Sequence, residues 1–136
     1  MAGHENSIRK FLEHYGAALS AGNLAQVVAC WEVPAFVLAD EGAIPVAAER
    51  EVHQFFAGAV QAYRSQGLAS TRPEVLRLES LGQRLAAVDV RWSARDAAGQ
   101  EQTSERSRYL LRRGDDEKWH IRVAITVEDD ATSAAT

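Results

Sequence analysis

The hydrophobic pattern of this chain changes from a helical to an alternating period after Gly67. In most of the sequence before this glycine, apolar residues recur every three or four positions, which is the spacing of one helical face. After it, apolar and polar residues alternate, as in a strand with one buried face. A chain with helices first and a run of such strands afterwards is predicted to fold as an α+β domain, in which the helices cover the apolar face of an antiparallel sheet.

Three amphipathic helices are predicted in the first half of the chain. The first ends at Gly22, because glycine readily adopts the left-handed conformation that ends helices. The second begins at Asn23 and ends at Pro34, because the residue before a proline is disfavoured in helical geometry. After a short strand at residues 35–40, the third helix begins at about Ala48. The apolar stripes contain Ile8, Phe11, Leu12, Tyr15, Ala18 and Leu19, then Leu24, Val27, Val28 and Trp31, then Val52, Phe55, Phe56, Ala59, Val60 and Tyr63.

Alternating strands are predicted in the second half, separated by turns that contain glycine. The clearest strand spans residues 86–95 and places Val88, Val90 and Trp92 on its inner face. Because consecutive strands joined by short turns usually pair, the strands are predicted to form an antiparallel meander. In the last strand, the alternation places one set of apolar residues together on the inner face: Trp119, Ile121, Val123, Ile125 and Val127.

Composition limits the classes of function. The 136 residues suffice for one domain, predicted over residues 1–128, and the acidic and small residues 129–136 are predicted to form a flexible tail. The net charge of −4 argues against nucleic-acid binding. A secretion signal or a membrane span is not expected, because no apolar run approaches ~18 residues. A chain with Cys30 as its single cysteine forms no internal disulfide, which suits the cytoplasm.

No metal or other cofactor is expected from the sequence. A single cysteine does not make a thiolate zinc site. The histidines lack the i, i+4 partner of a helical metal pair, and they lack a carboxylate-rich cluster. They are His4, His14, His53 and His120.

Two segments resemble a known superfamily. The stretch from Tyr15 to Leu24, followed by Trp31 and the short strand, is similar to the opening of nuclear transport factor 2-like proteins. The stretch from Tyr109 to Ile121 is similar to their last hairpin. The resemblance implies a cystatin-like cone, with a pocket between the helices and the concave face of a curved sheet, and frequent dimerisation through the sheet. Members include ketosteroid isomerase, scytalone dehydratase, limonene epoxide hydrolase, polyketide cyclases and non-enzymatic binders, so the resemblance implies a fold rather than one activity.

A small apolar pocket is the candidate site. A mainly apolar volume with a few hydroxyl groups is usual for a small-molecule site, so the leading interpretation is binding of a small apolar or hydroxylated organic ligand. Two alternatives stay open. One is an enzyme of the isomerase, dehydratase or polyketide-cyclase type, and the other is a dimerisation or partner-binding module whose cavity is filled by side chains. The predicted lining is Tyr15, Trp31, Phe55, Trp92, Ser107 and Tyr109, with Glu105 at the mouth.

Three residues are candidates for catalysis. Tyr15 corresponds, by the resemblance, to the oxyanion-binding tyrosine of ketosteroid isomerase. Glu105 or His53 could act as an acid or a base. The position of that isomerase's catalytic aspartate, however, falls on Ala39, and a one-residue slip turns the side chain of Asp40 to the opposite face of the strand. Steroid isomerisation is therefore not supported by the sequence.

A charged outer sheet face is predicted to form the interface of a homodimer. The alternation places Asp89 and Arg91 on the face away from the pocket, which argues against an active site like that of limonene epoxide hydrolase. On the outer face, Asp89 is expected to pair across strands with an arginine, and a two-fold axis can pair such charges reciprocally. The residues of this face are Asp89, Arg91, Arg106, Arg108 and Arg122.

Overall fold

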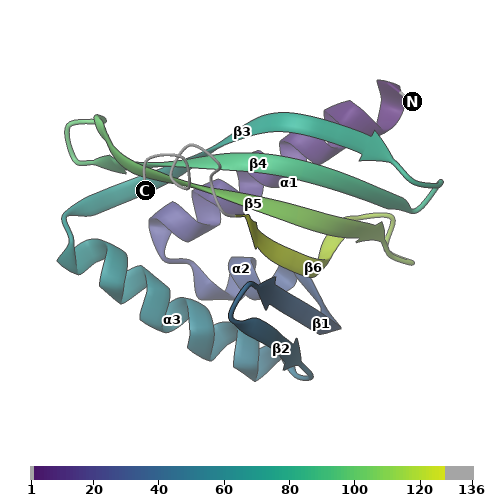
Figure 1. Ribbon diagram of the computed structural model, residues 1–136, viewed down its shortest axis with the longest axis horizontal. Helices are drawn as coiled ribbons and strands as arrows, with labels where there is room; N and C mark the ends of the chain where they lie inside the picture. Colours follow the sequence, from purple (N-terminus) through teal and green to yellow (C-terminus); the bar gives the residue numbers. More distant parts are fainter. Residues whose placement is uncertain (1, 128–136) are drawn as a thin grey trace.

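The computed structural model of this chain describes residues 2–127. It contains three helices and six strands in one sheet, which is the predicted α+β arrangement, as Figure 1 shows. The tail predicted at residues 129–136 lies outside the described residues. The elements in chain order are α1 (Ala2–Ala21), α2 (Leu24–Ala29), β1 (Trp31–Ala39), β2 (Gly42–Val46), α3 (Glu49–Ser65), β3 (Leu68–Ser80), β4 (Leu85–Asp96), β5 (Glu101–Arg113) and β6 (Trp119–Val127).

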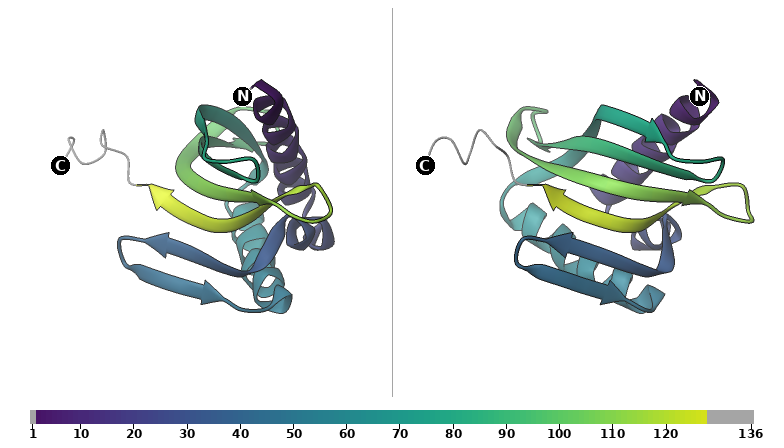
Figure 2. Two further views of the ribbon diagram at one scale, coloured as in Figure 1. Left: turned by 90° about the vertical axis from the view of Figure 1, so that its right-hand side faces the viewer. Right: turned by 45° about the vertical axis from the view of Figure 1, so that its right-hand side comes forward.

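The sheet has the strand order β2-β1-β6-β5-β4-β3. Strands β3 to β6 form an antiparallel meander, as predicted. Strand β1 pairs with β6 in parallel, so one pair departs from the antiparallel pattern that we expected. The strands β1 and β2 form a hairpin that joins the free edge of β6, and Figure 2 shows this hairpin beside the curved meander. Alternation within a strand does not specify the direction of its neighbour, which is why this pair was not predicted.

The second helix is shorter than predicted. Helix α2 ends at Ala29, and Trp31 begins β1 instead of closing the helix. Strand pairing explains the difference, because the backbone N–H of Ile121 donates to the carbonyl of Cys30 at 2.8 Å and Trp31 pairs with Ile121. The expected helix end at Pro34 is therefore wrong. Pro34 lies inside β1, where the register to β6 shifts and a missing backbone donor is tolerated.

A register shift in the β5–β6 pair changes which side chains of β6 face inward. The shift falls next to Leu110 in β5. Beyond it, Ala124 pairs with the buried Tyr109 and faces inward. Val123 and Ile125 consequently lie on the outer face, although the alternation predicted them on the inner face. A bulge of this kind inserts one residue and reverses the facing of every residue after it.

Helix α1 packs tightly against the sheet. Leu12 is fully buried, and Gly16 allows the close approach, because a Cβ atom there would lie 3.1 Å from the side chain of Trp92. The hydroxyl of Ser20 accepts a hydrogen bond from the backbone N–H of Thr71 at 2.9 Å. This bond fixes the last turn of α1 to β3.

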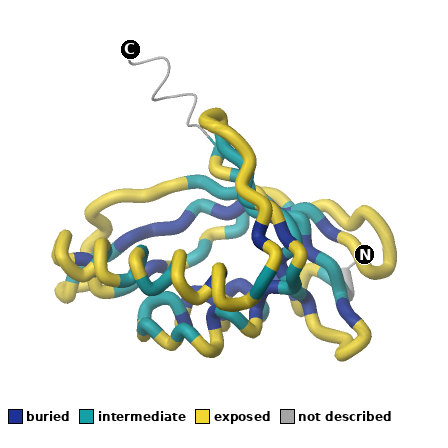
Figure 3. The backbone as a smooth tube through the Cα atoms, turned by 90° about the horizontal axis from the view of Figure 1, so that it is seen from below, coloured by how far each residue is buried: buried dark blue, intermediate teal, exposed yellow. Residues whose placement is uncertain are grey.

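Helix α3 lies farther from the sheet than α1 does. Val52 is its one buried residue, and most of its other positions are exposed, as the tube in Figure 3 shows. Both ends of α3 are held by hydrogen bonds. At the start, the Glu51 carboxylate accepts backbone hydrogen bonds from residues 47 and 48, and at the end, Arg64 donates to the carbonyl of Ala21 at 3.4 Å. Between these ends, the apolar stripe of α3 faces a hollow rather than a packed core.

Candidate functional site

A cavity of about 610 Å³ lies between α3, the end of α1 and the inner face of the sheet. Aromatic and aliphatic side chains make up most of its lining, and the polar part comes from hydroxyl groups, the Glu105 carboxylate and the Arg64 guanidinium. The structure brings together around this cavity the residues that the sequence suggested as a ligand site. They are Tyr15, Trp31, Phe55, Trp92, Glu105, Ser107 and Tyr109.

Tyr15 occupies the centre of the aromatic lining. Its ring centroid lies 5.9 Å from that of Trp92 and 6.4 Å from that of Tyr109, and both pairs meet edge to face. Phe56 of α3 meets Tyr15 in the same way at 6.4 Å. Edge-to-face contacts of this kind hold rings in fixed orientations. The deep wall of the cavity is therefore a rigid aromatic surface contributed by α1, α3 and two strands.

Two tryptophans hold the two buried tyrosine hydroxyl groups. The indole Nε1–H of Trp31 donates to the Tyr15 oxygen at 3.1 Å, and that of Trp92 donates to the Tyr109 oxygen at 2.8 Å. Tyr15 is 2% exposed, and within the described part of the chain no acceptor is seen for its own hydroxyl proton. A buried donor without a partner is costly, so this proton is available to an acceptor inside the cavity.

Burial keeps the phenols of the cavity protonated. It raises the pKa of Tyr15 well above its ordinary value, and it raises the pKa of Tyr109 to about 12. Hydrogen bonds from Ser107 and Trp92 oppose the second shift only in part. At neutral pH, both groups are therefore neutral donors and acceptors rather than anions.

Glu105 lies at the mouth of the cavity and has a partner that the sequence analysis missed. The hydroxyl of Tyr63 in α3 donates to Glu105 Oε1 at 3.1 Å. Burial, reinforced by the Glu105 carboxylate, raises the pKa of Tyr63 to about 12. The signal for Tyr63 was in the sequence, because it lies on the same helical stripe as Phe55 and Phe56. Of the rings on this stripe, the predicted site contains only Phe55.

Other candidates fall outside this arrangement or at its rim. His53 is exposed on α3 and is not part of the cavity lining, so it does not join Tyr15 and Glu105. Phe55 is 59% exposed and covers the edge of the mouth, with its ring 5.0 Å from that of Phe56. The inward positions created by the bulge in β6 add Ala124 and Thr126, for which simple alternation provided no signal.

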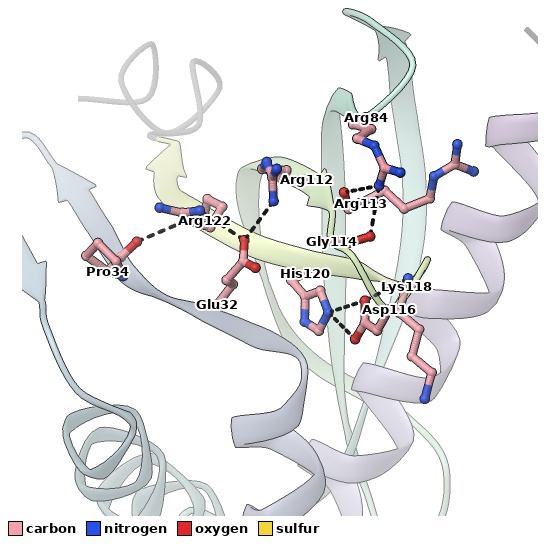
Figure 4. A network of polar contacts seen from close by, with 10 residues as sticks. All are labelled: Glu32, Pro34, Arg84, Arg112, Arg113, Gly114, Asp116, Lys118, His120 and Arg122. Carbon is pink, nitrogen blue, oxygen red and sulfur yellow. Dashed lines mark hydrogen bonds and ion pairs between the residues drawn. The ribbon is translucent and has the colours of Figure 1, made fainter.

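The outer sheet face carries several ion pairs. Arg108 donates to both oxygens of Asp89, at 2.6 and 3.1 Å, and it holds the pKa of Asp89 below its ordinary value. Arg122 pairs with Glu32 of β1 at 2.9 Å, as Figure 4 shows. Arg112 approaches the same carboxylate at 3.6 Å, so Glu32 holds β1 against β5 and β6. In each of these pairs at least one side chain is in contact with water, and ion pairs at the surface contribute about 0–1 kcal/mol each.

The described residues contain neither a metal cluster nor a membrane-spanning helix. Within residues 2–127, no three His, Cys, Asp or Glu side chains gather into a group that could hold a metal ion. No helix in that range is long and apolar enough to cross a membrane.

The fold around this cavity occurs in solved structures of low sequence identity. A domain of unknown function with a cystatin-like fold from Nostoc punctiforme matches with a TM-score of 0.72 at 19% identity, over 99% of this chain and 85% of that chain. The protein Aln2 from a Streptomyces species matches with a TM-score of 0.75 at 13% identity, over 100% of this chain and 98% of that chain. A ketosteroid isomerase-like protein from Erwinia carotovora atroseptica matches with a TM-score of 0.65 at 12% identity, over 91% and 96%. These matches show that the chain has a cystatin-like fold.

A family model makes the assignment more specific. The model described as NTF2-like protein (DUF6841) matches residues 4–129. The chain therefore belongs to this NTF2-like family. No protein with a curated description matches it in sequence.

Proposed function

We propose that this protein binds a small organic ligand in the cavity between α3 and the sheet. The volume of about 610 Å³ lies within the range of roughly 300–1,000 Å³ that is usual for ligand sites. The half-buried stripe of α3 supports the proposal, because a helix that covered a packed core would bury more of its apolar residues. A cavity filled by its own side chains, the partner-module alternative, does not fit a volume of this size.

The observation that carries the proposal is the hydroxyl group of Tyr15. Its oxygen accepts from Trp31, and its proton is left for an acceptor inside an aromatic cavity. A neutral, flat ligand with a carbonyl or hydroxyl oxygen supplies such an acceptor and fits against the surrounding rings. The cavity is lined by one carboxylate, that of Glu105, and one guanidinium, that of Arg64, so its formal charges balance, which suits a neutral ligand.

The test is a fluorescence titration with the acetyl ketone of dimethylaminonaphthalene, which is neutral and flat and carries one carbonyl group. Binding in an apolar cavity shifts its emission to shorter wavelength. We expect Tyr15→Phe to weaken binding by about five- to tenfold, the loss of one hydrogen bond to the carbonyl. Ser80→Ala is the control, because it removes an exposed hydroxyl at the far end of β3. A wild-type protein that leaves the emission unchanged would contradict the proposal.

Proton abstraction next to a carbonyl is the second candidate function. It is supported by one observation, that the Tyr15 donor and the Glu105 carboxylate line the same cavity. With the carbonyl held by Tyr15, the carboxylate could remove a proton from the neighbouring carbon. The acetyl ketone tests this in deuterated buffer, where its methyl protons should exchange faster with wild-type protein than with Glu105→Gln. Equal exchange rates would remove this candidate.

We also propose a homodimer through the outer sheet face. The register places an apolar stripe across β1, β6 and β5, because Phe36 and Leu110 both pair with Val123, and Leu38 pairs with Ile125. The charged residues expected at the interface lie beside this stripe, and several already pair within one chain. The stripe therefore supplies the association energy in this proposal. We call the outer apolar stripe the set Phe36, Leu38, Leu110, Val123 and Ile125.

The cytoplasm is the proposed location. Cys30 is buried and free, and burial raises the pKa of its thiol to about 11. A buried thiol without a disulfide partner suits a reducing compartment. Detection of the full-length protein in a secreted fraction would contradict this proposal.

A further inference from the structure

A second, smaller cavity of about 150 Å³ adjoins the ligand cavity. Both cavities share the same four wall residues, Tyr63, Leu68, Trp92 and Glu105. The smaller cavity extends toward the β4–β5 hairpin and is more polar in its remaining walls. Those walls come from Gln66, Ala94, Thr103 and Ser104.

One hydrogen bond spans the junction of the two cavities. Leu68 and Trp92 are buried and form a floor that continues from one cavity to the other. Above this floor, Tyr63 reaches from α3 and donates to Glu105 Oε1 of β5 at 3.1 Å. The raised pKa of Tyr63, about 12, keeps its phenol able to donate throughout the neutral range. Both side chains have rotatable bonds and are at least partly exposed, so they can separate without unfolding the chain.

We propose that the Tyr63–Glu105 hydrogen bond is a movable partition that sets the length of the ligand. With the bond formed, the larger cavity accepts a compact ligand. With the bond broken, the polar end of an elongated ligand enters the smaller cavity. The inference rests on the function proposed above, because it concerns a ligand in the same site.

The walls beyond the partition define the chemical class of the elongated ligand. Gln66 offers an amide and Thr103 a hydroxyl group, whereas the alternation along β5 turns the Ser104 side chain to the opposite face of the sheet. The body of the ligand is therefore apolar and lies against the rings of the larger cavity. Its far end carries a hydroxyl or amide group that hydrogen-bonds beyond the partition.

The experiment compares two probes of different length on each variant. One is the acetyl ketone of dimethylaminonaphthalene, and the other is its ω-hydroxyhexanoyl ketone, which adds a flexible chain that ends in a hydroxyl group. Tyr63→Phe keeps the ring and removes the hydrogen bond. We expect it to shift the ratio of the two Kd values toward the longer probe by roughly three- to tenfold, the range for one lost hydrogen bond.

Matched variants separate the partition from general effects on α3. Ser65→Ala removes a hydroxyl that donates to the carbonyl of Ala62 at 2.8 Å and lines neither cavity, so the ratio should stay at the wild-type value. Glu105→Ala should shift the ratio as Tyr63→Phe does. Glu105→Gln retains an acceptor oxygen for Tyr63, so its ratio should stay near that of the wild type.

The outcomes distinguish this inference from the proposed function. Suppose that the acetyl ketone binds the wild-type protein, and that the ratio of the two Kd values is the same in Tyr63→Phe and Glu105→Ala as in the wild type. The proposed partition is then wrong, whereas the proposed ligand cavity is still supported. If the acetyl ketone does not bind the wild-type protein, the proposed function falls and the partition falls with it. If Tyr63→Phe does not fold, the ratio measured with Glu105→Ala decides.

Discussion

Tyr15, Tyr63 and Tyr109 are the three tyrosines of the sequence, and all of them line one cavity. Two accept hydrogen bonds from tryptophan indoles, and the third donates to a carboxylate. The pKa of each of these phenols is raised, because burial disfavours the charged form. The three phenol groups in the cavity lining are therefore neutral, and their hydrogen-bond partners set their orientations.

Because of these raised pKa values, the stability of the fold is expected to decrease at alkaline pH. A tyrosine whose pKa is higher in the folded state than in the unfolded chain contributes to stability. This contribution is complete at any pH at which the tyrosine is protonated in both states. The contribution is complete below the ordinary value of 10.0 and is lost as the pH rises toward about 12. We expect the urea midpoint of unfolding to fall over this range. Tyrosinate absorbance should not develop while the fold persists near pH 10.0.

The unfolded chain in concentrated urea is the control for this titration, since its tyrosines should ionise with their ordinary pKa. Folded protein that develops tyrosinate absorbance with the same midpoint as the unfolded chain would show that the tyrosines are accessible to water. The structure of the cavity would then be wrong in its most buried part.

At the scale of the elements, α1 and α3 contact the sheet in different ways. Helix α1 approaches so closely that a Cβ atom at Gly16 would lie 3.1 Å from Trp92, and Ser20 bonds its last turn to β3. Helix α3 buries only Val52 and is held mainly at its ends. The difference leaves space under α3, so the cavity is a consequence of how the two helices pack.

Glycine substitutions in the two helices test this difference. In Gly16→Ala, the new Cβ atom would lie 3.1 Å from Trp92 and 3.2 Å from Pro73. Overpacking of this kind costs about 1–3 kcal/mol, which exceeds the gain of up to ~1 kcal/mol in helix propensity. Gly58→Ala in α3 is the matched control, because nothing lies within 4 Å of the added atom. It should stabilise the protein by about 0.5–1 kcal/mol.

Denaturant unfolding measures both changes. If Gly16→Ala proved as stable as Gly58→Ala, α1 would not lie against β3 and β4 as described, and the difference between the two helices would not exist.

The sequence predicted those parts of the fold that depend on local periodicity. The stripes of α1 and α3 and the inner residues of β4, such as Val88 and Trp92, followed from spacing alone. These residues are buried, pack partly buried against the core, or line the cavity. The bulge beside Leu110 and the parallel β1–β6 pair did not follow, because both depend on contacts between distant segments. The predicted lining therefore included positions in β4 and β5 and omitted those that β3, β6 and, apart from Trp31, β1 contribute.

At the scale of the whole molecule, the curved sheet presents two different faces. The inner face encloses the cavity together with α1 and α3, and the outer face carries ion pairs and the outer apolar stripe. Phe36 in this stripe is 47% exposed. A large apolar residue exposed beside other apolar residues is typical of an interaction surface.

The proposed dimer is tested by sedimentation equilibrium. We expect wild-type protein to sediment as a dimer, because a stable interface buries ~1,200 Å² or more and the stripe provides an apolar centre. Val123→Asp should yield a monomer, since it places a charge in that centre. Leu81→Asp is the control, because it replaces an exposed apolar residue in the turn between β3 and β4, which does not carry the outer apolar stripe. Wild-type protein that remains monomeric at high concentration would contradict the dimer.

The measurement that tests the ligand site most directly is a map of backbone amide chemical shifts on addition of the acetyl ketone. A ligand in the cavity should produce its largest shifts at inner positions on three different elements, Ala59, Ser107 and Ala124. The outer apolar stripe should change little, because the sheet separates it from the cavity. Shifts that are largest at Phe36 and Val123 and absent from the inner positions would contradict the central claim, which is that the space under α3 is a ligand site.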